Sequence, residues 1–278
     1  MSLFISSLNS GSNGNCYYVG NESEAILVDV GISCREVDKR MKRLGLSMQK
    51  VKAVLISHEH SDHIRGLCGL IKKYHIPVYI TSKTLLHCNF VLDNNLVKNF
   101  DAHNPIVIGN LSVTAFPKLH DASDPYSFVI ECEGVKVGVF TDIGAPCKLL
   151  IKHFQQCNAA FLESNYDEAM LDSGSYPYHL KRRIRGGNGH LSNNQALDLF
   201  IKYRPPFMSH LFLSHLSNNN NCPDIVRQLF SKHAAEVKII IASRFEETGL
   251  YHIGKVDYQR RKLITNAISA PQLAFQFA

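Results

Sequence analysis

A six-residue run, His58-Glu59-His60-Ser61-Asp62-His63, constrains this 278-residue chain more than any other feature. It directly follows an apolar segment that predicts a buried strand. Side chains two apart on extended backbone point the same way, so His58 and His60 can face one ion together. Asp62 and His63 then fall on the first turn of a following helix, where they can face a second ion. Imidazole and carboxylate side chains suit zinc, manganese or iron. The spacing of these four side chains therefore predicts a centre for two metals.

Three further candidates, His120, Asp142 and His215, each close a predicted strand. Ligands in sheet-based enzymes gather beyond the strand ends, where loops converge on a cleft. With the six-residue run they supply the number of ligands that two ions need, with Asp142 between the ions. A lone histidine, in a chain with 14 of them, is more often a surface or core residue. The clustered set is more specific, because burying it without metal would demand many compensating hydrogen bonds.

The rest of the pattern predicts an α/β chain rich in strands. Short β-branched runs predict strands at residues 3–7, 25–30, 53–56, 78–80, 111–116, 127–132, 135–140, 159–162, 208–213 and 237–241. Apolar positions three and four apart predict helices at residues 34–44, 62–74, 146–156, 192–203 and 224–233. No repeat or Pro/Gly-rich linker divides the chain. We therefore expect one domain over residues 1–278, and assign no role to the segment beyond about residue 254.

Composition narrows the class of protein. With 45% hydrophobic and 19% charged residues, the chain fits a globular protein. It has no uninterrupted apolar stretch of about 18 residues, so we expect no membrane span. The N-terminus lacks the basic and apolar segments of a secretory signal, which favours the cytoplasm. Eight scattered cysteines without CxxC pairs predict reduced structural thiols rather than disulfides or a zinc ribbon.

A basic, glycine-rich segment before residue 192 predicts a phosphate-facing surface. An S-x-x-Q capping box starts a helix there, and the free N–H groups of a helix N-terminus favour an anion. Upstream, a basic run would share one helix face, and the glycines that follow let backbone approach a ligand closely. A solvated face would explain the basic run equally well. The residues expected to contact phosphate are Lys181, Arg182, Arg185, His190, Ser192 and Asn193.

These motifs, in this order, resemble those of the metallo-β-lactamase superfamily over most of the chain. The resemblance implies a four-layer αββα sandwich with a dinuclear metal centre between two sheet edges. By this resemblance one metal is held by His58, His60 and His120. The other is held by Asp62, His63 and His215. Asp142 joins the two, and Asp29 supports the site from behind.

Shorter motifs are similar to those of the YycJ/WalJ group of bacterial metallohydrolases. They are SGSNGN at residues 10–15, LHD at 119–121, LESN at 162–165, GHLSN at 189–193 and HLSNNN at 215–220. The group is described as DNA exonucleases acting from the five-prime end, which implies that activity here. Two motifs depart from its usual pattern: residues 163–165 are Glu-Ser-Asn instead of Glu-Ala-Asn, and residues 123–125 are Ser-Asp-Pro instead of Ala-Glu-Pro. Both departures leave the ligands intact.

The resulting hypothesis is a phosphodiesterase with two divalent metals, zinc or manganese, with iron as an alternative. Hydroxide held between the ions would attack phosphorus in line. Asp62 would orient it, and His190 would give a hydrogen bond or proton to the phosphate or the leaving oxygen. Nucleic acid is the expected partner, with DNA favoured.

Two other hypotheses stay open. One is a hydrolase of the same fold that acts on a small thioester or lactam. The basic run with His190 argues against it, because a small neutral substrate does not require either. The other is a catalytically silent nucleic-acid-binding protein that uses metals for stability. The ligand set argues against this one, because structural sites usually close their coordination, whereas this set leaves room for water.

Overall fold

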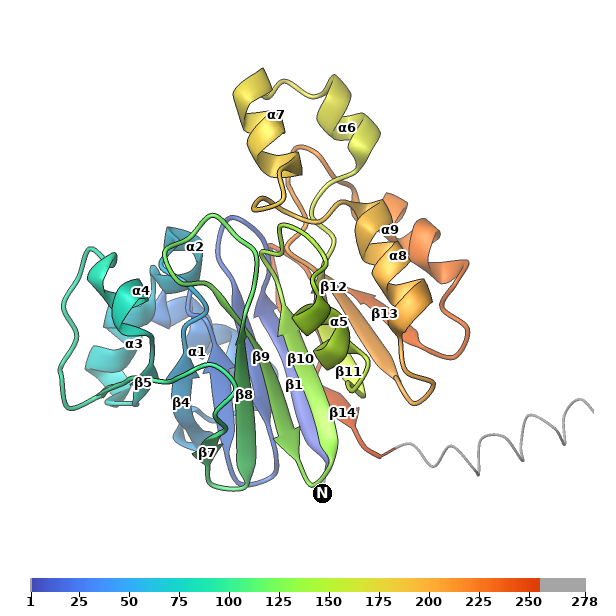
Figure 1. Ribbon diagram of the computed structural model, residues 1–278. Helices are drawn as coiled ribbons and strands as arrows, with labels where there is room; N and C mark the ends of the chain where they lie inside the picture. Colours follow the sequence, from blue (N-terminus) through green and yellow to red (C-terminus); the bar gives the residue numbers. More distant parts are fainter. Residues whose placement is uncertain (1, 256–278) are drawn as a thin grey trace, which may run out of the picture.

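Two seven-stranded sheets pack face to face in the computed structural model, which describes residues 2–255 (Figure 1). The first sheet has the order β14 (Tyr251–Ile253), β1 (Leu3–Asn9), β2 (Cys16–Gly20), β3 (Ala25–Val28), β4 (Val51–Leu55), β5 (Val78–Tyr79) and β6 (Val97–Lys98). The second has the order β13 (Lys238–Ile241), β12 (His210–Ser214), β11 (Ala159–Glu163), β10 (Val135–Phe140), β9 (Tyr126–Cys132), β8 (Leu111–Pro117) and β7 (Ile106–Ile108).

Helices cover the outer faces of both sheets. The helices among the described residues are α1 (Cys34–Arg43), α2 (Ser61–Ile64), α3 (Leu67–Tyr74), α4 (Ser82–Leu86), α5 (Lys148–Phe154), α6 (Glu168–Ser173), α7 (Tyr178–Arg185), α8 (Asn193–Tyr203) and α9 (Pro223–Ser231), with a short 3-10 turn η1 (Met48–Lys50). Apolar residues of α1 and α3 form one buried cluster with the first sheet, and those of α5, α8 and α9 form another with the second. The layers confirm the predicted αββα sandwich.

A third apolar cluster fills the space between the sheets. The rings of Phe161 and Phe212 pack there in a tilted arrangement with centroids 4.6 Å apart, and the ring centroid of Tyr17 in the first sheet lies 4.9 Å from that of Phe161. Large aromatic rings bury much apolar surface, which is the main favourable term in folding. This core fixes the two sheets against each other.

Strand direction determines where the loops meet. The strands β10 to β13 are parallel, and so are β3 to β6. The strand β8 also runs with β10, because both are antiparallel to β9. The carboxyl ends of these strands therefore meet at one edge of each sheet. Beyond that edge, α6 and α7 form a pair that projects away from the sandwich (Figure 1).

The predicted strands all form, with ends shifted by a few residues, and the capping box of Ser192 and Gln195 is confirmed. The prediction of one helix over residues 62–74 is wrong. Gly66 separates α2 from α3, where its N–H donates to the carbonyl oxygen of Val30 at 2.8 Å. The sequence patterns did not predict β2, β6, β7, β14, α4 and α6. The strand β2 is buried on both faces and so lacks the alternation by which a strand is recognised.

No helix among residues 2–255 has the length and apolar character needed to cross a membrane. The two sheets share one apolar cluster, and we propose on this basis that they form a single domain. The segment beyond residue 255, to which no role was assigned, lies outside the described residues.

Replacing Gly31 tests how closely the loop after β3 packs against α2. A Cβ atom at Gly31 would lie 1.7 Å from the carbonyl oxygen of Asp62. We expect Gly31→Ala to lower the free energy of unfolding by about 1–3 kcal/mol, because backbone has to move. Denaturant titration measures this. The control is Gly69→Ala in α3, where the new Cβ meets Cys34 at an ordinary 3.6 Å. Equal stability of the two variants would contradict the prediction.

Candidate metal centre

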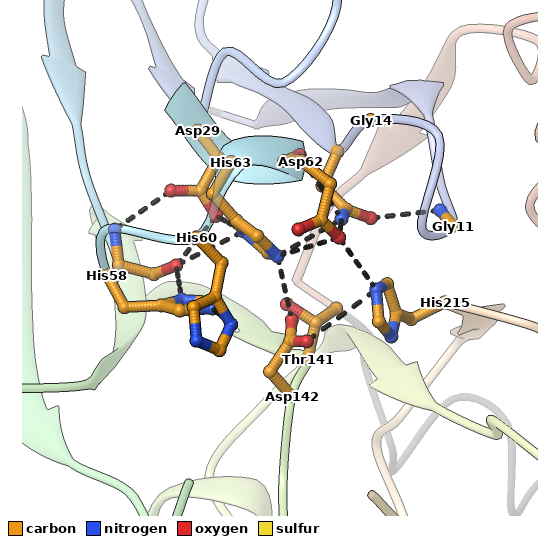
Figure 2. Close-up of polar contacts among 12 residues, drawn as sticks. Gly11, Gly14, Asp29, His58, His60, Asp62, His63, Thr141, Asp142 and His215 are labelled. Atoms are coloured by element: carbon orange, nitrogen blue, oxygen red, sulfur yellow. Dashed lines mark hydrogen bonds and ion pairs between the residues drawn. The ribbon is translucent and has the colours of Figure 1, made fainter. Parts of the chain in front are cut away.

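Loops at the carboxyl edge of the two sheets bring the predicted ligands together (Figure 2). His58 and His60 follow β4, and Asp62 and His63 lie on α2. The other three ligands follow β8, β10 and β12; they are His120, Asp142 and His215. Within the described chain these seven side chains belong to overlapping groups whose ligand atoms lie within 4.8 Å of one another.

The first group presents three ring nitrogens to one point. His60 Nδ1 lies 3.1 Å from His58 Nε2 and 3.3 Å from His120 Nε2. Nitrogens bound to a tetrahedral ion at about 2.0–2.1 Å lie about 3.3 Å apart, so the spacing fits one ion.

Hydrogen bonds behind these rings determine which nitrogen carries the proton. Ser57 Oγ donates its only hydrogen to Asp29 Oδ2 at 2.8 Å, so at 2.9 Å it can only accept from His58 Nδ1. Nδ1 of His120 donates to the carbonyl oxygen of Gly189 at 3.1 Å. Nε2 of both rings therefore carries a lone pair that faces another nitrogen, an arrangement that a bound cation stabilises.

The second group, which consists of Asp62, His63 and His215, is also oriented by hydrogen bonds. His63 Nδ1 donates to Asp29 Oδ2 at 2.7 Å, while its Nε2 lies 3.6 Å from Asp62 Oδ2. His215 Nε2 lies 3.4 Å from the same Asp62 oxygen. Asn15 Nδ2 donates to that oxygen at 3.2 Å and holds the carboxylate toward the rings. These donors also converge on one point.

Asp142 lies between the two groups (Figure 2). Its Oδ2 is 3.1 Å from His63 Nε2, and its Oδ1 is 3.6 Å from His215 Nε2 and 3.8 Å from His120 Nε2. The side chain is 2% exposed, and within residues 2–255 Oδ2 has no hydrogen-bond partner. A buried carboxylate oxygen without a hydrogen-bond donor is costly, so the donor set fits bound cations beside Asp142.

Three residues of the centre adopt left-handed backbone conformations. The φ angles of Asp29, Asp142 and His215 are 61°, 55° and 58°. Such angles are uncommon outside glycine and cost of order 1–3 kcal/mol each. Each of these residues turns the chain as it leaves a strand end. The surrounding sheets hold these turns in place, and their side chains meet at the cluster.

Burial and charge together set the protonation of the rings. Burial holds the pKa of His58 well below its usual value and lowers the pKa of His120 to about 4, so both rings are neutral at pH 7. Burial also opposes protonation of His63, but nearby carboxylates, Asp142 foremost, outweigh it and raise the pKa of His63 to about 10. The centre therefore concentrates negative charge around His63, which favours a bound cation.

Glu163 accepts hydrogen bonds from several groups at once. The motif at residues 162–165 did not indicate this role. Its Oε1 accepts from Nδ1 of His190 at 2.8 Å and from Nδ1 of His215 at 3.0 Å. Its Oε2 accepts from the backbone N–H of Ile143 at 2.7 Å and of Leu191 at 3.1 Å. Burial opposes its ionisation, but His190 and these hydrogen bonds outweigh burial and lower the pKa of Glu163 to about 2. The sequence feature that could have identified Glu163 as a site residue was its position at the end of a strand.

Lys118 is a second residue that the sequence analysis missed. It is 7% exposed, and its Nζ donates to the carbonyl oxygen of Thr141 at 2.8 Å. Burial lowers the pKa of Lys118. The contact supports the turn that carries Asp142. No sequence pattern marks it, because a lysine after a strand is ordinarily at the surface.

His190 lies beside the centre, as predicted. Its ring centroid is 5.3 Å from those of both His120 and His215, and its side chain is 17% exposed. Because Nδ1 donates to Glu163, Nε2 is the atom left to contact a ligand.

Ser192 and Asn193 are buried and hydrogen-bonded to protein. Ser192 Oγ donates to Glu168 Oε1 at 2.9 Å and accepts from the capped helix. Asn193 Oδ1 accepts from Ser164 Oγ at 2.7 Å. These contacts favour a structural role for both side chains over the predicted contact with phosphate.

The predicted basic residues lie on α7 and line a surface cavity of about 570 Å³ together with Tyr176 and Tyr178. Lys181 Nζ donates to the carbonyl oxygen of Asp172 at 2.7 Å, and Arg185 pairs with the Asp172 carboxylate. Arg182 is exposed. The chain leaves α7 through glycines and reaches the centre at Gly189, whose carbonyl holds His120. The segment that carries the basic face thus continues to the ring cluster.

A profile of the Beta-lactamase superfamily domain matches residues 24–215. The chain belongs to the metallo-β-lactamase superfamily. Exodeoxyribonuclease YycJ of Bacillus anthracis is 34% identical over 251 residues, which cover 88% of this chain and 94% of that protein. Exodeoxyribonuclease WalJ of Streptococcus pneumoniae strain D39 is 27% identical over 244 residues, which cover 86% and 91%.

Solved structures agree on the fold of this superfamily member. The crystal structure of the metallo-β-lactamase fold protein YhfI from Bacillus subtilis superposes with a TM-score of 0.69 at 16% identity, over 90% of this chain and 99% of that one. These matches confirm the predicted family, its YycJ/WalJ branch and the class of metal-dependent hydrolase.

Glu163→Gln tests whether the buried carboxylate orients the ligand rings. Glutamine keeps the shape but removes the charge that accepts the Nδ1–H of His215. We expect the affinity for zinc to fall about 10- to 100-fold, because a ligand loses its supporting carboxylate. Competition with a chelating indicator measures it. Glu131→Gln, at a side chain 41% exposed in β9, is the control. Wild-type affinity in both variants would contradict the orienting role.

Proposed function

We propose that the protein is a phosphodiesterase with two divalent metals, zinc or manganese, that removes nucleotides from the five-prime end of DNA. The observation that carries this proposal is Asp142, a buried carboxylate shared by two groups of ligands, with His190 beside it. The basic face of α7 on the same segment adds a surface for a polyanion. Relatives named exodeoxyribonucleases, aligned over most of their length, support DNA as the substrate.

The ligands divide as the contacts do. His58, His60 and His120 would hold one ion. Asp62, His63 and His215 would hold the other, with Asp142 between them. Bound metal ions in such a centre supply Lewis acidity and lower the pKa of water from 15.7 to about 7. Asp62, whose side chain is 17% exposed, is the ligand best placed to orient the attacking water as well.

His190 is the proposed catalytic residue that does not hold metal. Glu163 fixes the ring through Nδ1 at 2.8 Å. Nε2 would then donate a hydrogen bond or a proton to the phosphate or the leaving oxygen. Such proton transfer by a positioned side chain contributes about 10²- to 10⁴-fold to a rate.

Lys181, Arg182 and Arg185 would contact phosphates of the bound strand away from the cleaved bond. Two of them are paired with Asp172, so their contribution would come from the charge of the whole face rather than from buried hydrogen bonds. A small thioester or lactam would not use this face. The basic surface is therefore the feature that favours a nucleic acid over a small substrate.

Asp142→Ala tests the shared carboxylate. We expect wild-type protein to retain two equivalents of zinc or manganese after dialysis, and the variant to retain fewer than one, because both coordination spheres lose an oxygen. Elemental analysis by mass spectrometry measures the content. Asp198→Ala on α8, at a side chain 64% exposed, is the matched control. Full metal content and full activity in Asp142→Ala would refute the bridging role.

His190→Ala tests catalysis separately from metal binding. We expect turnover of DNA to fall about 100-fold or more with metal content unchanged, because the group that serves the leaving oxygen is lost. Release of nucleotides from end-labelled strands with a five-prime phosphate or hydroxyl, in zinc and in manganese, measures the rate and direction. His179→Ala, an exposed histidine on α7, is the control. Loss of both metals in His190→Ala would instead show a structural role, and wild-type metal without cleavage of any phosphodiester would sink the proposed function.

A further inference from the structure

A cavity of about 320 Å³ lies beside the centre, at the end of β13. Strand order explains its position. Asp142, Glu163 and His215 lie at the ends of β10, β11 and β12, and β13 is the next strand in the sheet. Ser10 joins the two sites, because it lines the cavity while its Oγ accepts the N–H of His215 at 2.7 Å. The lining residues that matter for the argument are Ser10, Leu216, Pro223, Ile241, Arg244 and Phe245.

Arg244 brings an unpaired donor to this cavity. Within residues 2–255, its Nη1 atom is buried and has no hydrogen-bond partner. A second arginine on the wall, Arg227, pairs with Asp224 at 2.6 Å. A buried guanidinium N–H without an acceptor costs free energy that an anionic oxygen would recover. Arg244 is therefore a cation on this wall with an unmet hydrogen-bond donor that a phosphate oxygen would satisfy, and Glu246 lies on the same wall.

Phe245 brings an exposed aromatic ring on an anchored backbone. The residue is 77% exposed, although phenylalanine ordinarily lies in the core. Its carbonyl oxygen accepts from Nη2 of the buried Arg40 at 2.9 Å, and its N–H donates to Ser243 Oγ at 3.1 Å. Asn13 Nδ2 donates to the carbonyl oxygen of Arg244 at 2.7 Å. Because its backbone is fixed, the exposed ring of Phe245 loses little conformational freedom when a planar group stacks on it.

We propose that this cavity binds one nucleotide of the substrate strand, adjacent to the bond cut at the metal centre. Arg244 pairs with its phosphate and Phe245 stacks on its base, while the apolar wall of Leu216, Pro223 and Ile241 covers the rest of the ligand. This inference rests on the proposed nuclease function and adds a subsite to it. It places the strand along the carboxyl edge of the second sheet, from Asp142 toward β13.

Binding without cleavage tests the subsite. The probe is a 3′-fluorescein-labelled oligothymidylate with phosphorothioate linkages, followed by anisotropy in zinc-containing buffer over a series of salt concentrations. We expect Arg244→Ala to raise Kd on the order of 10-fold and to reduce the slope of log Kd against log salt by about 0.7, because one phosphate contact is lost. Phe245→Ala is expected to raise Kd on the order of 10-fold with an unchanged slope, because stacking is not ionic.

Matched variants separate this result from changes in folding or overall charge. Arg35→Ala removes the same charge from the exposed face of α1, and Leu86→Ala removes an exposed apolar side chain from α4. Both are expected to bind as wild type. Arg244→Lys should restore the slope, and Phe245→Tyr should restore the affinity. Recovery in these two variants would show that the alanine effects come from charge and ring rather than from unfolding.

The outcomes also separate this inference from the proposed function. Arg244→Ala and Phe245→Ala proteins that bind the probe like the two controls overturn the subsite, even if wild type cleaves DNA. A wild-type protein that binds the probe but cleaves no DNA defeats the nuclease function, while the pattern of Kd and slope still decides the subsite. A wild-type protein that does not bind the probe overturns the subsite, and hydrolysis of bis(p-nitrophenyl) phosphate then tests the metal centre separately.

Discussion

Two buried carboxylates, Asp29 and Glu163, determine the arrangement on which the rest of the centre depends. One follows β3 in the first sheet and the other ends β11 in the second, and both are fully buried. Each accepts a ring N–H from behind and a backbone N–H from a neighbouring loop. Since an ionised carboxylate can only accept, the rings of His63 and His215 must donate through Nδ1. Their Nε2 atoms then face the space between the sheets' edges, where a bound cation would take the place of a second ring proton.

This arrangement depends on the sandwich beneath it. The strands β10, β11 and β12 are parallel, so Asp142, Glu163 and His215 leave the second sheet at the same edge. The cluster of apolar side chains between the sheets holds that edge opposite the loop after β4. Such a rigid frame can retain the left-handed turns at Asp29, Asp142 and His215, which an isolated loop would relax. The packed sheets thus fix the positions of the candidate ligands.

The sequence predicted which side chains gather at this edge, because the candidate ligands combine rare residue types with strand ends. The strand before residue 58, the four-ligand run and the later His120, Asp142 and His215 are all local features, and the structure brings them together. Glu163 and Lys118 were missed because their roles arise only from tertiary contacts: a carboxylate shared by two distant rings, and a lysine folded inward onto Thr141. Ser192 shows how a tertiary contact adds to a local prediction. Its cap was predicted correctly, but no local pattern revealed that Glu168 would also engage the same hydroxyl.

The net charge of the candidate centre bears on how many ions an anionic substrate would need there. Four carboxylates meet there, those of Asp29, Asp62, Asp142 and Glu163, and Lys118 is the buried cation among them. Together they carry three negative charges when the rings are neutral. One divalent ion would leave this centre negative and repel a phosphodiester, whereas two would leave one positive charge to attract it before the attacking water loses its proton. In the proposed nuclease, a second ion would serve the binding of an anionic substrate as well as its hydrolysis. In that proposal the two ions would supply the positive charge at the bond that is cut, and the unpaired guanidinium of Arg244 would supply positive charge at the neighbouring subsite.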